Sequence, residues 1–173
     1  MLRIWLFVLL LSFFGQGLFS QEFESFTPIV LKGVLKLENS TKPLAGARIF
    51  ALSKNDTLGL AQSDSLGYME MFLPYDKDLL IFYSFQGTAS KSLMVDTRNI
   101  PDKLKNEGFE LNIDISLPEI IKGVDYQLLQ EPIGLVLFDK NTDNFSFDNP
   151  YTRKKIKQYL SFKSKMLEAI EAN

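Results

Sequence analysis

The chain has 173 residues, with 19 Lys and Arg against 21 Asp and Glu, and it contains neither Cys nor His. Without those two residue types, Ser-His-Asp triads, Cys-His pairs and the usual zinc sites are excluded, so catalysis would depend on carboxylates, Lys, Tyr or Ser. The formal net charge of −2 offers no strongly basic patch for nucleic acid. We therefore expect no metal, no cofactor and no nucleic-acid partner.

The first 20 residues have the layout of a secretory signal peptide. Arg3 supplies a positive start, the run from Ile4 to Phe14 is apolar, and Ser20 is a small residue suited to cleavage. The apolar run is shorter than the roughly 20 residues that a membrane span needs. We expect residues 1–20 to be removed from an exported protein, and an uncleaved anchor is the alternative. Since the chain lacks Cys, its core must hold it together without disulfides.

Short apolar runs alternate with polar turn clusters across residues 29–117. The predicted strands cover residues 29–37, 47–52, 58–62, 68–73, 79–85, 90–95 and 109–117. The run at 79–85 is almost wholly apolar, which suits a central strand covered on both faces. Seven short strands without an intervening helix predict a two-sheet β-sandwich, preceded by a loose lead-in at residues 21–28.

A second unit is predicted for residues 118–173. Residues 133–138 and 145–147 have the pattern of a β-hairpin. Asp148 or Asn149 can cap a following helix, which takes Pro150 in its first turn and should run to about residue 169. The expected fold class is therefore mainly β: a seven-stranded sandwich followed by a β-hairpin and a C-terminal amphipathic helix.

Three short segments of the sandwich carry a family likeness. They are Gly33-Val34-Leu35, Pro43-Leu44-Ala45-Gly46-Ala47-Arg48-Ile49 and Ser63-Asp64-Ser65-Leu66-Gly67-Tyr68. Together they resemble the carboxypeptidase regulatory-like domain, although Ser63 replaces a Thr and Met69 stands where an aromatic residue is usual. The resemblance implies a transthyretin-like, Greek-key sandwich over residues 29–117. Similar domains are common in exported proteins of Gram-negative bacteria, so it also implies the periplasm, the outer membrane or the cell surface.

The turn residues of these segments have a structural explanation. Gly46 and Gly67 can adopt the backbone angles that tight turns need. Asp64 can accept hydrogen bonds from the backbone that follows it. We therefore expect these segments to specify the fold and to carry no chemistry.

A partial calcium-loop pattern lies between the two predicted hairpin strands. Asp139, Asn141 and Asp143 have the spacing that opens such a loop. Asn144 stands where the loop requires Gly, and Pro150 stands where a bidentate Glu would be. A solvated hairpin turn is the favoured interpretation, without a metal.

Two short segments match an O-glycosylation pattern of the same bacterial group. In Asp56-Thr57-Leu58 and Asp64-Ser65-Leu66 the acceptors would be Thr57 and Ser65, each on an exposed turn where modification is feasible. A three-residue pattern also arises by chance, so unmodified turns are the alternative.

The C-terminal helix carries most of the information on binding. On a wheel of 100° per residue, an arc of about 120° holds Ile156, Tyr159, Leu160, Met166, Leu167 and Ile170, with Lys163 inside it. Six basic and two acidic side chains give the helix a charge of +4, against −7 for the rest of the chain after residue 20. Either this arc packs on the sandwich, or the helix docks elsewhere through Ile156, Tyr159, Leu160, Lys163 and Leu167. The partner would be an envelope protein or glycan, or anionic lipid headgroups in a peripheral membrane contact.

The remaining polar and aromatic residues leave an enzymatic alternative open. Available carboxylates are Glu70, Asp76, Asp78, Asp114 and Asp125, and no spacing pairs any two of them. Exposed aromatics could stack on a sugar, and core packing explains them equally well; they are Tyr68, Phe72 and Tyr75. We expect no enzyme but a non-catalytic, exported binding or assembly module of the cell envelope. The alternatives are a His-free, carboxylate-dependent enzyme acting on glycans or peptidoglycan, and an envelope structural protein held by an uncleaved N-terminal segment.

Overall fold

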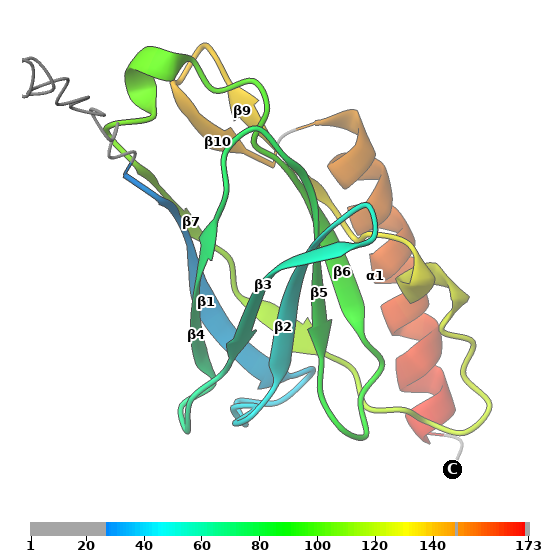
Figure 1. Cartoon of the computed structure of the whole chain (residues 1–173). Helices are drawn as coiled ribbons and strands as arrows, with labels where there is room; N and C mark the ends of the chain where they lie inside the picture. Colours follow the sequence, from blue (N-terminus) through cyan, green and yellow to red (C-terminus); the bar gives the residue numbers. More distant parts are fainter. Residues whose placement is uncertain (1–26, 148, 172–173) are drawn as a thin grey trace, which may run out of the picture.

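The computed structural model describes residues 27–147 and 149–171. The predicted signal peptide at residues 1–20 and nearly all of the lead-in lie outside this part of the chain. The strands are β1 (Ile29–Leu37), β2 (Arg48–Ser53), β3 (Asp56–Gln62), β4 (Tyr68–Leu73), β5 (Asp78–Ser84), β6 (Lys91–Asp96), β7 (Phe109–Asn112), β8 (Ile115–Leu117), β9 (Leu135–Asp139) and β10 (Asn144–Ser146). The helices are the short 3₁₀ turns η1 (Asp102–Leu104) and η2 (Gln127–Gln130) and the long α1 (Pro150–Glu171). The prediction of a mainly β sandwich followed by a helix is confirmed (Figure 1).

The first sheet is organised around β1. This strand pairs antiparallel with β4 and parallel with both β7 and β8. The prediction of one continuous strand over residues 109–117 is wrong, because the chain breaks at Ile113 and Asp114. There the Ile113 N–H donates to the Lys32 carbonyl at 2.8 Å, and the Val34 N–H donates to the Asp114 carboxylate at 2.9 Å. The break requires Gly33 opposite it, since a Cβ at that position would lie 2.0 Å from the Ile113 carbonyl oxygen.

The second sheet has the strand order β10-β9-β6-β5-β2-β3. The predicted hairpin forms as β9 and β10, and β9 joins the sheet by parallel pairing with β6. The hairpin therefore extends the sandwich at the edge beside α1. Most other predicted strands agree with the observed ones within two residues, and those at 29–37 and 68–73 agree at both ends.

Alternating burial along the strands builds the core between the two sheets. On β1 the side chains of Ile29, Leu31 and Leu35 point inward and are fully buried. They face inward side chains of the second sheet, among them Ile81 and Tyr83 on β5. The Tyr83 hydroxyl has no hydrogen-bond partner among the described residues. Burial raises the pKa of this hydroxyl.

Turn residues from the family-like segments act as expected from their chemistry. Gly46 and Gly67 have positive φ angles of 83° and 77°. The Asp64 carboxylate accepts hydrogen bonds from the backbone N–H groups of Leu66 and Tyr68, each at 2.9 Å. These contacts fix the turn between β3 and β4, so the segments are explained by folding alone.

Helix α1 begins where the sequence predicts, at Pro150. Asn149 is its cap, because the Asn149 side-chain oxygen accepts a hydrogen bond from the Thr152 N–H at 2.9 Å. The helix runs beside β6 and β9, along one open side of the sandwich, and leaves β2 and β3 uncovered (Figure 1). Within the described residues, no helix combines the length and the apolar character needed to cross a membrane.

Candidate functional site

The rotation of α1 about its axis decides which of its side chains can bind a partner. Buried positions on α1 recur at three- and four-residue intervals: Thr152, Lys155, Phe162 and Met166 are buried and Tyr159 is half-buried. On an ideal helix this buried arc is rotated by roughly 70° from the apolar arc predicted from the sequence. The helix does pack on the sandwich, as one of the two predicted alternatives requires, but largely through other residues.

A buried polar cluster, which we call the Glu38 cluster, holds the middle of α1. The Tyr159 hydroxyl donates to the Glu38 carboxylate, which also accepts from the Lys91 ammonium at 3.1 Å. The side chains of Glu38 and Lys91 are each only 4% exposed. Lys91 further donates to the Ser116 carbonyl, and its ammonium lies 4.1 Å from the centroid of the Tyr159 ring. The cluster thus joins the end of β1, β6 and β8 to the helix.

Burial and charge shift the pKa values of two members of the Glu38 cluster. Burial, together with the hydrogen bond to Glu38 and its charge, raises the pKa of the Tyr159 hydroxyl, so Tyr159 remains a donor. Burial lowers the pKa of Lys91, and the neighbouring Glu38 carboxylate opposes that shift. Lys163 adds a second cation, with its ammonium 3.5 Å from Glu38. The enclosed side chains of Glu38 and Lys91 serve to attach the helix to the sandwich.

The two ends of α1 are held by different chemistry. At the N-terminal end, the Thr152 hydroxyl donates to the Leu135 carbonyl at 3.1 Å and accepts from the Leu135 N–H at 3.0 Å. One turn later Lys155 forms an ion pair with Glu131. At the C-terminal end, Phe162 and Met166 form a small apolar cluster with Leu129 of η2. These contacts together fix the helix along most of its length.

Four aliphatic side chains on a neighbouring face of α1 remain in contact with solvent. We call them the apolar stripe: Ile156, Leu160, Leu167 and Ile170, which are 51%, 59%, 40% and 47% exposed. Their centre lies roughly a quarter turn from the centre of the buried arc. Lys163, whose side chain is 36% exposed, lies within the stripe.

The structure therefore divides the five residues predicted to dock. Ile156, Leu160 and Leu167 are exposed and available, and Lys163 is partly exposed. Tyr159 is not available, because the Glu38 cluster holds its hydroxyl. The wheel could not separate Tyr159 from its neighbours, since the partners Glu38 and Lys91 lie 121 and 68 residues away in the chain.

A groove of about 650 Å³ lies between α1 and residues 123–131. Its lining mixes the apolar side chains of Val124, Leu128 and Phe162 with the amides of Gln127 and Gln158. No sequence pattern predicts this groove, because it forms between two segments whose contact depends on the packing of η2 on Phe162 and Met166. It is open and chemically mixed, and it shares Phe162 with the buried side of α1.

Other predicted sites keep the exposure that was expected of them. The prediction that Thr57 lies on a turn is wrong, because β3 begins at Asp56 and Thr57 pairs with Leu52 of β2. Ser65 does lie in a turn, before β4. Both residues are exposed, so glycosylation of either stays a prediction. Asp139 accepts hydrogen bonds from the backbone and side chain of Asn141 at 2.9 Å, as a solvated hairpin turn requires. Across residues 27–147 and 149–171, no group of three or more acidic side chains is placed to hold a metal ion.

The five candidate carboxylates lie in separate surroundings. Glu70 accepts from the Tyr68 hydroxyl, Asp76 pairs with Lys105, Asp78 lies near Arg98, Asp114 accepts from the Val34 N–H, and Asp125 accepts from the Gln127 N–H. Each therefore has a local structural partner of its own.

Of the candidate aromatics, Tyr68 and Phe72 are 39% and 61% exposed on the outer face of β4. Tyr75 is half-buried, and its hydroxyl donates to the Thr27 and Lys105 carbonyls.

Comparison with known proteins adds little to this picture. No family model matches the chain, and no curated protein matches its sequence. A chlorocatechol 1,2-dioxygenase from Pseudomonas putida aligns with a TM-score of 0.39 and 11% identity, over 56% of this chain and 62% of that one. A type II cohesin–X-dockerin complex from Acetivibrio cellulolyticus aligns at 0.33 and 11%, over 50% and 51%. A 9R-lipoxygenase from Cyanothece aligns at 0.34 and 14%, over 71% and 20%.

This chain spans less than two thirds of each of the three solved chains, and TM-scores this low support no inference about function. None of the three is a carboxypeptidase regulatory-like domain, so that resemblance stays a prediction from the sequence.

Proposed function

We propose that this chain is a non-catalytic binding or assembly module of the cell envelope, exported by its N-terminal segment. The observation that carries the proposal is the apolar stripe. Its aliphatic side chains stay exposed on one face of α1 while the adjoining face fixes the helix to the sandwich. A contiguous exposed aliphatic surface is typical of an interaction site.

The distribution of carboxylates supports a binding role over the enzymatic alternative. An enzyme of the His-free type would need two carboxylates facing one cleft. Instead, the candidate carboxylates contact different neighbours, such as Lys105 for Asp76 and the Val34 N–H for Asp114. The groove beside α1 is lined by the carboxylates of Asp125 and Glu131, and Glu131 is engaged in an ion pair with Lys155.

Site-specific photo-crosslinking in the native envelope tests the proposal. A crosslinking side chain is placed at Leu160 in the apolar stripe and, as a matched control, at Leu66, which is 73% exposed in the turn between β3 and β4. We expect adducts with envelope components from position 160 and none from position 66. The proposal fails if position 160 yields no adduct, or if the purified protein turns over glycan or peptidoglycan and loses that activity when one carboxylate is replaced.

A further inference from the structure

The apolar stripe has a fixed direction before any partner binds. From Ile156 to Ile170 it covers about 21 Å of helix. Tyr159 and Phe162, on the neighbouring face, are held by the Glu38 cluster and by the η2 cluster. Turning the stripe into the sandwich would break both sets of contacts. The stripe is therefore presented to the surroundings without a folding step on binding.

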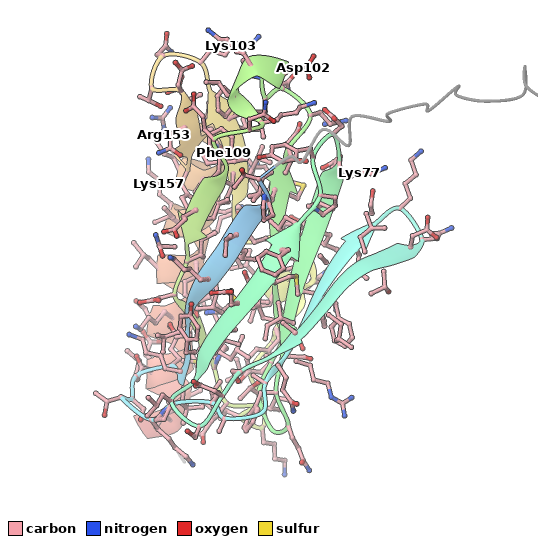
Figure 2. All side chains as sticks on the ribbon, turned by 60° about the vertical axis from the view of Figure 1, so that its left-hand side comes forward. Lys77, Asp102, Lys103, Phe109, Arg153 and Lys157 are labelled. Carbon is pink, nitrogen blue, oxygen red and sulfur yellow. The ribbon has the colours of Figure 1, made fainter. Side chains whose placement is uncertain are left out.

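The solvent side of α1 carries basic side chains, and two of them border the stripe. Arg153, Lys154, Lys157 and Lys165 are all exposed. On an ideal helix, Arg153 and Lys157 lie within roughly a quarter turn of the stripe's centre. Figure 2 shows both at the outer edge of the molecule, on the same side. The two acidic residues of the helix, Glu168 and Glu171, come only in its last turn. The N-terminal part of the exposed face is thus aliphatic and basic together.

The basic side chains beside the stripe help to identify what covers this surface. A dry protein interface would remove water from the exposed Arg153 and Lys157. At a lipid surface their stems lie along acyl chains while their charges reach the headgroups. Lys163 already directs its charge to Glu38, with its ammonium 3.5 Å from that carboxylate. A second copy of this chain is disfavoured, because it would bring together two helices that each carry six basic and two acidic residues.

We infer that α1 attaches the protein to an anionic lipid surface, with the apolar stripe at the boundary of headgroups and acyl chains. The inference rests on the proposed docking role of the stripe and names its partner. Arg153 and Lys157 contact lipid phosphates, and each basic side chain near such a surface adds roughly fivefold to affinity. Salt screens the attraction between these cations and the lipid phosphates, so attachment weakens as salt rises.

Co-flotation with vesicles tests the inference on the chain from residue 21 onward. The protein is mixed with phosphatidylcholine vesicles, with or without phosphatidylglycerol, at low and high salt. The first variant, Leu160→Asp with Leu167→Asp, removes aliphatic contact. The second, Arg153→Glu with Lys157→Glu, reverses charge beside the stripe. The matched control, Lys42→Glu with Lys54→Glu, makes the same change in net charge at exposed lysines in turns of the sandwich.

We expect binding to phosphatidylglycerol vesicles at low salt, about tenfold or greater loss of affinity in the first two variants, and little loss in the control. Circular dichroism should show all three variants folded. The inference is overturned if anionic vesicles do not bind, or if the aspartate variant binds as well as the wild type. It is also overturned if sedimentation shows a dimer that only the aspartate variant loses. If vesicles fail to bind while position 160 still crosslinks to an envelope protein, the inference fails and the binding role stands.

Discussion

The space between the two sheets and the contact between α1 and the sandwich are filled in different ways. Between the sheets, inward positions of β1 and β5 carry aliphatic side chains such as Leu31 and Ile81, with Tyr83 as a polar exception. The contact beneath the middle of α1 is the Glu38 cluster, and we call this contact the seam. In it the charged side chains of Glu38 and Lys91 are buried against Tyr159. The core thus gains stability from the apolar surface that it removes from water. The seam depends on each buried charge having its ion-pair and hydrogen-bond partners.

This difference decides how each region responds to substitution. Replacing a large core side chain by a small one lowers the free energy of unfolding in two ways: the removed atoms no longer contribute their transfer free energy, and a cavity remains. A broken buried ion pair costs the desolvation of the partner left behind, and an apolar replacement of both partners can restore most of the loss. The two regions can therefore be distinguished by single and double substitutions.

The largest effect should come from the core. We expect Leu31→Ala to lower the free energy of unfolding by about 4 kcal/mol, because Leu31 is fully buried in the close-packed space between the sheets. Urea unfolding followed by circular dichroism measures this, with the exposed Leu66→Ala as the control. A loss below about 1 kcal/mol would mean that the sheets do not enclose a packed core.

A substitution in the seam should lower the free energy of unfolding slightly less than Leu31→Ala does. We expect Glu38→Ala to cost about 3 kcal/mol, since Lys91 would be left buried without its carboxylate. The double variant Glu38→Leu with Lys91→Met should recover much of that loss. Urea unfolding of both proteins provides the measurement. If the double variant is less stable than the single one, apolar groups cannot replace the pair and the seam requires its polar geometry.

Sequence reasoning succeeds in the region where each side chain's position is decided locally. The predicted bounds of the strands at residues 29–37 and 68–73 match β1 and β4, because an apolar run and the turn residues that bound it are both local features of the sequence. The same logic fails at residues 109–117, where β1 imposes a break through the close approach of Gly33 to Ile113. That constraint lies in another strand, so no pattern within residues 109–117 reveals it.

The seam shows why the candidate site was only partly predictable. A helical wheel ranks faces by hydrophobicity, and on that basis Leu160 belongs inside and Lys155 outside. In the structure Lys155 is buried with Glu131 as its partner, and Leu160 is exposed. Polar partners distant in the chain can thus override apolar periodicity. The capping of α1, in contrast, is local: the sequence offered Asp148 or Asn149, and the Asn149 side chain accepts the hydrogen bond from the Thr152 N–H.

A smaller effect of opposite sign is expected within the core. Tyr83→Phe removes a buried hydroxyl that has no partner among the described residues, so it should raise the free energy of unfolding by about 1 kcal/mol. Burial raises the pKa of this hydroxyl, so above about pH 10 the unfolded chain releases a proton that the folded chain retains. Wild-type stability should therefore fall as pH rises beyond that value. The fall should be shallower in Tyr83→Phe; equal slopes in urea titrations would contradict this account.

The smallest effect should come from the exposed face of α1. If the predicted apolar arc were core, Leu160→Asp would loosen or unfold the protein. Because Leu160 is 59% exposed, we instead expect a change within about 0.5 kcal/mol, measured by urea unfolding. Phe162→Asp is the matched comparison, since Phe162 is buried beside Leu129 on the adjoining face and should lose several kcal/mol. Equal losses at both positions would mean that α1 is rotated from the orientation described, and that its exposed stripe is part of the protein's own interior.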